Sequence, residues 1–356
     1  MNNTDKQPMS KKKKIILTVV AVLLVVLLSA LVVGVVIYNR LLNSIGRFDD
    51  ATVPTTDPAV IEATETKATE ETEPPTTVDP YDFDTLFPGE EPIGGEIINI
   101  MLVGQDTRNP EYRGLSDTMI LVSINPSNGR LVMTSFIRDL YIDIVGITGS
   151  GLYKDRLNTA YCTGGIDQLG NTLAYNFGIE IDNYIEVDFY AFETLVDALG
   201  GVDLELTEAE ANHMKYHYKH EHIVPGMNHL NGDEALNFAR IRAIDNDFNR
   251  TARQRYVISE LIKKVKTAGI ADLLKLAEEF LPLVTTDMSN KEITKYIIQL
   301  APLLKDLEVT SLRVPQDGTW GGINVGTEEA PKYVIQCMDL KANRDMIEEA
   351  IGIKKD

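Results

Sequence analysis

Cysteine is scarce in this chain of 356 residues, which holds only Cys162 and Cys337. No histidine clearly partners Cys162, and the sequence has no GxSxG motif of the kind that carries a serine nucleophile. A catalytic thiol and a serine hydrolase site are therefore not indicated. No internal repeat is present either, which leaves an ordinary globular chain long enough for one large domain or two small ones.

Positive charge is also in short supply, because the formal net charge is -19. Residues 1–47 are basic, with seven Lys or Arg against one Asp, whereas residues 48–95 hold thirteen acids against one lysine. The rest of the chain is acidic. A nucleic-acid partner requires a basic footprint, so this balance argues against nucleic acid.

Charge is wholly missing from Ile15 to Ile37, a run of 23 mostly apolar residues. At about 1.5 Å per residue such a helix spans about 34 Å, slightly more than the hydrocarbon layer of a bilayer. The lysines that precede the run place the N-terminus in the cytoplasm by the positive-inside rule. A cleaved signal peptide fits less well, because the run is long and no A-x-A site follows it.

The next segment has few large apolar residues. Nine of the 27 residues from Ala51 to Thr77 are threonine, and Glu and Pro make up half of the others, so this stretch cannot bury enough surface to fold. We expect a cytoplasmic tail over 1–14, a transmembrane helix over 15–38, an extracellular linker over 39–95 and a folded domain over 96–356. The protein is then a single-pass protein of the cell membrane, with that domain outside, as in a Gram-positive type envelope.

The folded region begins with three apolar runs that predict strands, at Glu96 to Asp106, Thr118 to Pro126 and Arg130 to Ile137. Further strands are expected at 184–187 and 308–314. Helical patterns are found at 166–177, 188–199, 232–238, 249–267, 271–280 and 291–304. Strands interspersed with helices predict an α/β fold of three layers, α/β/α, with a central mixed β-sheet.

Acids and arginines alternate at the ends of the first three strands. They are Asp106, Arg108, Arg113, Asp117, Arg138 and Asp139. Carboxylates on neighbouring strand ends can hold one hard cation, and arginines beside it offer planar forks to phosphate oxygens. Ordinary ion pairs between loops are the interpretation that composition alone favours, and the spacing does not decide between the two.

A second group of arginines lies in RIRAIDNDFNRTARQR, residues 240–255. On an extended strand Arg240 and Arg242 would share one face. On a helix from about Asn249, Arg250, Arg253 and Gln254 would form one stripe. Converging guanidinium groups indicate a phosphate or pyrophosphate ligand, unless Asp245, Asp247 and Glu260 neutralise them locally; we expect Arg255 to lie on the surface.

Seven blocks of this chain, in order, resemble the LytR-CpsA-Psr family of membrane-anchored phosphotransferases. The blocks are GQDTR, RGLSDTMILVSINP, SFIRDLYIDI, DRLNTAYCTGG, VDALGGVDLEL, LNGDEALNFARIR and DFNRTARQR. They cover Glu96 to about Lys266, and a looser likeness continues through LEVTSLRVP. In this chain Ile137 stands where the family has proline, and Arg156 and Leu157 stand where it often has Lys-Ile.

The resemblance implies an enzyme that takes a glycopolymer, such as teichoic acid or capsule, from a polyprenyl pyrophosphate carrier. It implies transfer, with one phosphate, to the 6-hydroxyl of N-acetylmuramic acid in peptidoglycan. Matched by motif, the Mg²⁺ ligands are Asp106 and Asp117, and the pyrophosphate clamp is Arg138, Arg240, Arg242 and Arg250. Arg108, Arg113, Asp247, Arg253 and Gln254 match supporting positions. As a hypothesis, Asp139 or Asp247 accepts the proton of the attacking hydroxyl.

Two other functions use the same residues and stay open. A non-catalytic polyprenyl phosphate binder, acting as a regulator or scaffold, needs the arginines but not both aspartates. A lipid pyrophosphatase would replace the sugar with water. The sequence does not identify the polymer.

All five histidines lie between His213 and His229, and His213 with His217 has the i, i+4 spacing of zinc ligands on a helix. Met214 stands at the Glu position of HExxH, so the alternative is a polar surface segment at the rim of the site. Cys162 and Cys337, on the side of the membrane where disulfides persist, are a possible pair that would fasten the C-terminal segment to the core.

Overall fold

The computed structural model describes residues 38–47, 55–56, 91, 93–105, 112–113, 116–147, 151–269, 275–276, 278–303, 305–327 and 331–353. Residues 38–45 form a compact unit of their own, in which 38–44 are helical. The residues from Gly46 onward form a second unit, which contains the predicted fold.

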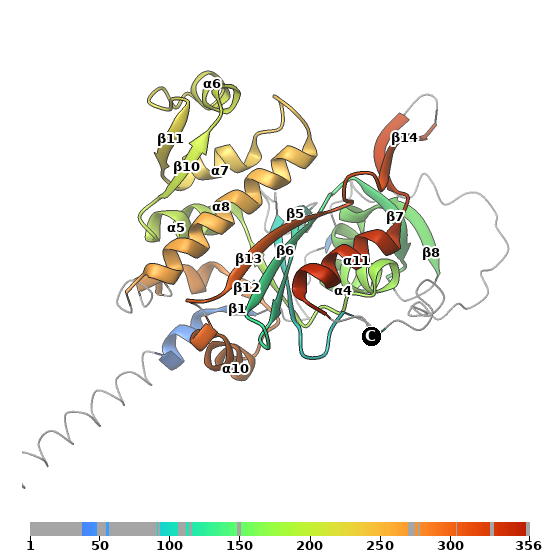
Figure 1. Cartoon of the computed structure of the whole chain (residues 1–356), viewed down its shortest axis with the longest axis horizontal. Helices are drawn as coiled ribbons and strands as arrows, with labels where there is room; N and C mark the ends of the chain where they lie inside the picture. The colour runs from blue at the N-terminus through green and yellow to red at the C-terminus, as the bar shows by residue number, and fades with distance from the viewer. Residues whose placement is uncertain are drawn as a thin grey trace, which may run out of the picture. The chain divides into compact units, whose positions relative to one another are not determined.

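A seven-stranded mixed sheet is the centre of this second unit (Figure 1). Its order is β1 (Gly46–Arg47), β12 (Thr285–Thr286), β9 (Asn183–Val187), β3 (Ile98–Gln105), β5 (Ser116–Asn125), β6 (Arg130–Phe136) and β13 (Glu308–Val314). The three predicted strands are β3, β5 and β6, which pair antiparallel, while β9 and β13 add parallel to the two sides.

Both faces of this sheet are covered by helices. Side chains that alternate along a strand therefore enter two different cores. On one face Met101 and Leu121 pack with the helices α4 (Leu157–Phe177) and α11 (Leu340–Ile351). On the other face Ile120 and Met133 pack with α8 (Asp247–Thr267) and α10 (Asn290–Leu300). Figure 1 shows α8 and α11 on opposite sides of β5 and β6. The predicted layers of helix, mixed sheet and helix are confirmed.

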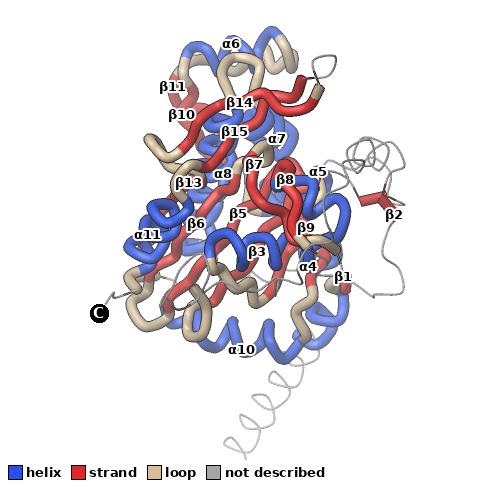
Figure 2. Tube along the Cα trace, turned by 90° about the vertical axis from the view of Figure 1, so that its right-hand side faces the viewer, coloured by secondary structure: helices blue, strands red, loops and turns tan. Residues whose placement is uncertain are grey.

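A second sheet has the order β14 (Trp320–Gly326), β15 (Pro331–Cys337), β7 (Leu140–Val145) and β8 (Leu152–Arg156), which Figure 2 shows side by side. The backbone N–H of Ile335 donates to the carbonyl of Asp139, so the β14–β15 hairpin is fixed to the chain just after β6. Two short strands, β2 (Thr55–Thr56) and β4 (Tyr112–Arg113), pair with each other.

α8 belongs to two cores at once. Its residues Ile258 and Ile262 face the large sheet, whereas Val257 and Leu261 face a smaller core. That smaller core is built from α5 (Phe189–Ala198), β10 (Val202–Leu206), α6 (Glu208–Tyr216), β11 (Gly226–Leu230) and α7 (Gly232–Arg240). The start of α8 is fixed by Asn246, whose side chain accepts the backbone N–H of Asn249. The position of the arginines on α8 is therefore set from both sides.

Most of the predicted helices are present, with different ends. α4 begins nine residues before the expected Ile166, because Gly164 and Gly165 leave the helical conformation and hide the first part from a periodicity analysis. The 3-10 helices Leu281–Leu283 and Ala301–Leu303 flank α10. Of the helix expected over 271–280, only 275–276 and 278–280 are described, and these are helical.

The expectation that Arg240 and Arg242 lie on one extended strand was wrong. A capping box at Asn231 and Glu234 starts α7, and the helix continues through Arg240 before Ile241 becomes extended. The apolar residues of GDEALNFAR bury one helical face, which a strand could not do. The two arginines therefore point in different directions.

The possible disulfide is not formed. Cys162 is buried in α4, while Cys337 ends β15 and accepts a hydrogen bond from Asn343 Nδ2 at 3.4 Å. Burial raises the pKa of the Cys337 thiol to about 11. Both cysteines are reduced thiols in this structure.

The proposed transmembrane helix, residues 15–38, falls outside the described residues except for Tyr38. Most of the expected linker, 39–95, and the expected tail, 1–14, also fall outside them. Among the residues that are described, no helix has the length and apolar character to cross a bilayer.

Candidate active site

Three segments far apart in the sequence bring charged side chains to one edge of the large sheet. Asp117 lies at the start of β5, and Arg138 and Asp139 follow the end of β6. Because β5 and β6 run antiparallel, the start of one meets the end of the other. Asp247 and Arg250 join them from the first turn of α8.

Arg138 is the centre of the group. Its Nη1 lies 2.5 Å from Oδ1 of Asp117, and its Nε lies 3.4 Å from Asp139 Oδ2 and 3.9 Å from Asp247 Oδ1. Burial opposes the charge of this guanidinium, but the three carboxylates outweigh it and raise the pKa of Arg138. Arg138 is therefore a permanent cation.

Two more arginines close the group. Arg250 Nη2 donates to the backbone carbonyl of Asp117 at 3.1 Å and lies 2.8 Å from Asp247 Oδ1. Arg242 reaches both Asp139 and Asp247, at 3.7 and 3.9 Å. Arg250 is buried, whereas Arg242 is about half exposed. Arg250 is thus held inside the group, whereas Arg242 lies on its solvent-exposed side.

Asp247 differs from the other two aspartates of the group. Burial raises its pKa, and the nearby Arg250 and Arg138 only partly offset this rise. Neither carboxylate oxygen accepts a hydrogen bond from any described residue, although Arg250 Nη2 is close, so that contact is an ion pair without hydrogen-bond geometry. A buried carboxylate with free acceptor sites and a raised pKa can take a proton.

Arg156 is a member of the group that the sequence did not assign to the site. It ends β8, and its Nη1 lies 3.3 Å from Oδ1 of Asp139. The next turn helps to place Arg138, because the backbone N–H of Asn158 donates to the Arg138 carbonyl at 3.2 Å. The signal was the DRLN block, where a basic residue directly precedes a helix.

Several predicted site residues lie elsewhere or are not described. Asp106 and Arg108 are outside the described residues, and only the backbone of Arg113 is described, in β4. Arg240 ends α7 with its guanidinium 4.4 Å from the Phe189 ring centre, and within the described chain it makes no ion pair with the three aspartates. Gln254 is partly buried on α8, and its Oε1 has no hydrogen-bond partner among the described residues.

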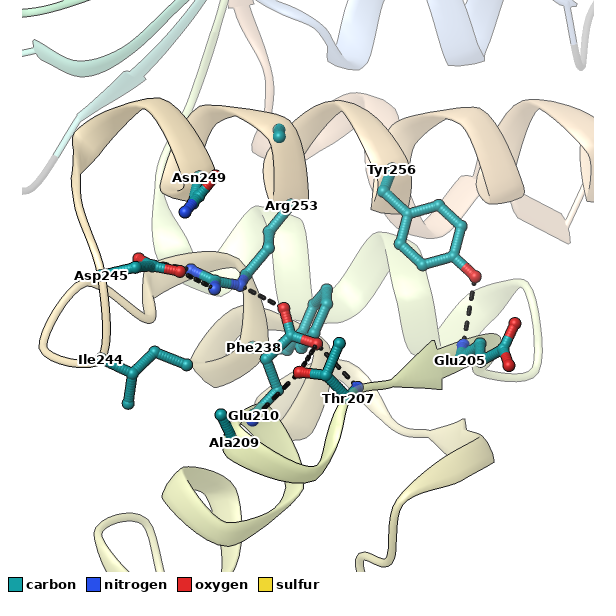
Figure 3. Close-up of a pocket in the computed structure, with 11 residues that line it drawn as sticks. Glu205, Thr207, Ala209, Glu210, Phe238, Ile244, Asp245, Asn249, Arg253 and Tyr256 are labelled. Carbon is teal, nitrogen blue, oxygen red and sulfur yellow. Dashed lines mark hydrogen bonds and ion pairs between the residues drawn. The ribbon is translucent and has the colours of Figure 1, made fainter.

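Arg253 belongs to a different network from Arg250, so the predicted single stripe divides. Its Nε lies 2.6 Å from Glu210 Oε1, and it also pairs with Asp245 and donates to the carbonyl of Ile241. Figure 3 shows the side chains of Arg253, Glu210 and Asp245 in a pocket of about 410 Å³ between α6 and α8. Arg253 thus closes the small core around α8.

Arg255 was expected to lie on the surface, and this prediction was wrong. It is buried and faces the large sheet, and burial together with the neighbouring Arg313 lowers its pKa to about 10. The expectation was wrong because position 255 shares its face of α8 with the apolar Ile258 and Ile262.

The donor types in this group suit a hard divalent cation, since Mg²⁺ prefers carboxylate oxygens. Asp117, one of the two expected ligands, is partly exposed and pairs with Arg138 and Arg250. The described residues contain no cluster of three His, Cys, Asp or Glu side chains able to hold a metal. Asp117 therefore fits a Mg²⁺ ligand by its chemistry and needs at least one ligand from outside these residues.

The histidine segment is fully described and does not form a zinc site. The rings of His213 and His217 stack with centroids 4.7 Å apart, and Tyr218 packs edge-on against both. Stacked rings do not direct their nitrogens at a common point. His220 and His222 lie near Glu234 instead, and no metal-binding group of three is found in this part of the chain.

Known proteins resemble this chain in both sequence and fold. A Bacillus cereus protein named polyisoprenyl-teichoic acid--peptidoglycan teichoic acid transferase TagU is 40% identical over 174 residues, 48% of this chain and 54% of that protein. A Bacillus anthracis protein of the same name is 33% identical over 236 residues, 65% of this chain and 73% of that protein. The chain thus spans about half the length of the first relative.

Among solved structures, the LytR-CPS2A-psr family protein YwtF (TagT) with bound octaprenyl pyrophosphate lipid superposes with a TM-score of 0.53 at 25% identity. The match covers 74% of this chain and 98% of that one. The model of the LytR_cpsA_psr family matches residues 59–340, which is most of the chain. With the sequence blocks, the mixed sheet and the arginine–aspartate group in agreement, the chain belongs to the LytR_cpsA_psr family.

Proposed function

We propose that this protein is a phosphotransferase that moves a glycopolymer, with one phosphate, from a polyprenyl pyrophosphate carrier to the 6-hydroxyl of N-acetylmuramic acid in peptidoglycan. The names of its relatives support a transferase that joins a polyisoprenyl-linked polymer to peptidoglycan. The lipid bound to the related YwtF carries the same pyrophosphate group.

One observation carries the proposal. Four arginines, Arg138, Arg156, Arg242 and Arg250, meet three aspartates where β5, β6, β8 and α8 come together. Such guanidinium groups can bind the oxygens of a pyrophosphate through paired hydrogen bonds. Phosphoryl transfer depends mainly on positioning and on neutralising the charge of the transferred group, which this arrangement supplies.

In the proposed reaction the 6-hydroxyl oxygen of the acceptor sugar attacks the phosphorus atom that carries the glycopolymer. The bond from that phosphorus to the bridging oxygen breaks, and the electron pair leaves with the polyprenyl monophosphate. The hydroxyl proton passes to Asp247, the carboxylate with free acceptor sites and a raised pKa. Asp247 also contacts three arginines, but these are ion pairs without hydrogen bonds. Asp139 instead accepts hydrogen bonds from Arg138 and Arg156, so its proposed role is to hold these arginines in place.

Mg²⁺ is the proposed cofactor, with Asp117 and Asp106 as its protein ligands. When bound, it would neutralise charge on the phosphate oxygens. Arg138 and Arg250 hold Asp117 at the sheet edge, where its carboxylate is partly exposed. Arg240 and Gln254 complete the proposed phosphate-binding set if they turn toward the group on substrate binding.

The proposed location is the outer face of the cell membrane. The apolar run over residues 15–38 would anchor the chain with its N-terminus in the cytoplasm. Residues 39–95 would tether the folded domain, residues 96–356, within reach of both a membrane-borne carrier and the wall, although two parts of this segment, Gly46–Arg47 and Ile93, already pack with that domain. This arrangement suits an enzyme with a lipid-linked donor and an acceptor in the peptidoglycan.

The test uses the full chain in detergent micelles with Mg²⁺, a synthetic lipid-linked disaccharide pyrophosphate and peptidoglycan fragments. Mass spectrometry should find a fragment that has gained the disaccharide and one phosphate. A free disaccharide phosphate without that product would indicate a hydrolase, and binding without either product would indicate a regulator. Arg138→Met should lose the product, while the control Lys263→Gln, an exposed charge on α8, should keep it.

A further inference from the structure

Within the part of the chain that the structure describes, one arginine of α8 has neither a counter-ion nor a full set of hydrogen bonds. Arg255 is 9% exposed, and its Nε and Nη1 have no hydrogen-bond partner among the described residues. The charged group that perturbs it is another arginine, Arg313, and not a carboxylate. Buried guanidinium groups are normally paired, so this one requires a partner of negative charge.

Arg313 stands on a strand that packs against α8. It lies on β13 with its guanidinium 4.3 Å from the ring centre of Phe248, in the first turn of α8. Its carboxylate partner, Asp317, is 91% exposed at the side chain, so water screens that pair strongly. The positive charge that Arg313 brings to this side of α8 is therefore only weakly compensated.

A hydroxyl lies on the same face. Ser135 of β6 is the register partner of Arg313 in the parallel ladder, so both side chains lie on one side of the sheet. That side is the one covered by α8, because Met133, two residues earlier, packs with Ile258. Ser135 is 1% exposed, and its hydroxyl has no hydrogen-bond partner among the described residues.

Ser135 and Arg255 lie on the same two elements as residues of the proposed active site. β6 carries Ser135 and, three residues later, Arg138; α8 carries Arg250 and, about 7.5 Å further along its axis, Arg255. Three aspartates balance the arginines around Arg138. No described carboxylate pairs with Arg255, so its positive charge is uncompensated, in contrast to the arginines of that group.

We propose that Arg255, Arg313 and Ser135 form a second anion subsite that holds a phosphate monoester. In the proposed function, on which this inference rests, that group is the phosphate that leaves with the polyprenyl carrier. Beyond Arg255 the same face of α8 is apolar, with Ile258 and Ile262, and this suits the hydrocarbon side of the leaving group better than a sugar. Inorganic phosphate has the same chemistry and is the other possible source.

The subsite has a thermodynamic signature that a structural arginine lacks. Without an anion, a buried and unpaired guanidinium destabilises the folded protein. Arg255→Met should therefore raise the melting temperature of the unliganded protein by a few degrees. The same change should remove most of the stabilisation that an added phosphate monoester gives, because binding to the folded state raises the melting temperature.

The experiment measures thermal unfolding of the full chain in detergent micelles, with and without inorganic phosphate or a short polyprenyl monophosphate. Arg255→Met and Arg313→Gln should each weaken the affinity for the anion at least tenfold. Arg255→Lys, which keeps the charge, should recover part of it. The control Lys263→Gln removes an exposed charge from the same helix and should leave the affinity unchanged.

If the Arg255 and Arg313 variants lose affinity for both probes, or for the polyprenyl monophosphate alone, the subsite binds the leaving group. If they lose affinity for inorganic phosphate alone, it binds free phosphate. Arg255→Met that melts lower than the wild type and binds both probes normally would overturn the inference. If Arg255→Met does not fold, Arg313→Gln and Arg255→Lys decide by the same affinities. Absence of transfer by the wild type would overturn the proposed function, whereas these binding results would still stand.

Discussion

Replacement of Arg253 by methionine separates the two arginine networks of α8. The guanidinium of Arg253 and the carboxylate of Glu210 are both nearly buried, with side-chain exposures of 7% and 12%, and lie 2.6 Å apart. Breaking such a pair leaves a buried charge without its partner, which costs about 3–5 kcal/mol. For a domain of this size the expected fall in melting temperature is about 6–20 °C.

The assay is thermal unfolding of the full chain in micelles, followed by circular dichroism, with transfer measured per folded molecule. Glu210→Gln together with Arg253→Met should be more stable than Arg253→Met alone, because the double variant no longer leaves the Glu210 carboxylate buried and unpaired. Transfer by folded Arg253→Met should stay within about threefold of wild type. A melting temperature within 2 °C of wild type, combined with a 100-fold loss of transfer, would refute this reasoning and make Arg253 a phosphate ligand.

The pH dependence of stability also tests the pair of Arg253 and Glu210. Burial alone would raise the pKa of Glu210, but hydrogen bonds from Arg253 and Thr207 outweigh it, so the folded pKa is lowered. A lowered carboxylate pKa adds stability that is present above the unfolded value of about 4.5 and is lost as the pH falls through the folded value. The stability difference between wild type and Glu210→Gln should therefore shrink below about pH 4.5.

Three further outcomes are expected. Asp247→Asn should slow single-turnover transfer by about 10²–10⁴-fold while lipid binding persists, since it removes a proton acceptor; an unchanged rate would exclude Asp247 as the base. Both Cys162 and Cys337 should react with a thiol reagent after unfolding without reductant, and a count of zero would show a disulfide. His213→Gln with His217→Gln should leave Mg²⁺-dependent transfer intact, whereas a loss restored by zinc would contradict the stacked arrangement.

The strands and the start of α8 could be predicted from the sequence because their signals are local. β5 and β6 are apolar runs joined by a PSNG turn, and Gly129 in that turn takes a positive φ that glycine adopts easily. Asn246 lies directly before α8 as its N-cap. Each of these features depends on a few adjacent residues.

The directions of the arginines could not be predicted, because distant residues determine them. Arg253 turns away from Arg250 toward Glu210, which precedes it by 43 residues and lies on α6. Arg255 is the exception, because Ile258 and Ile262, three and seven residues further along α8, are apolar and helix periodicity alone could have placed it on the buried face. Arg156 reaches Asp139 across the pairing of β7 with β8, so its place in the site depends on that hairpin.

The central claim is that the group around Arg138 carries out transfer to peptidoglycan, and one comparison tests it most directly. Transfer of the synthetic disaccharide phosphate to peptidoglycan fragments is measured for Arg138→Met and for Arg130→Met, a partly exposed arginine at the other end of β6. We expect at least a 100-fold loss of phosphodiester product for Arg138→Met and a rate near wild type for Arg130→Met. Equal rates for the two variants would contradict the claim.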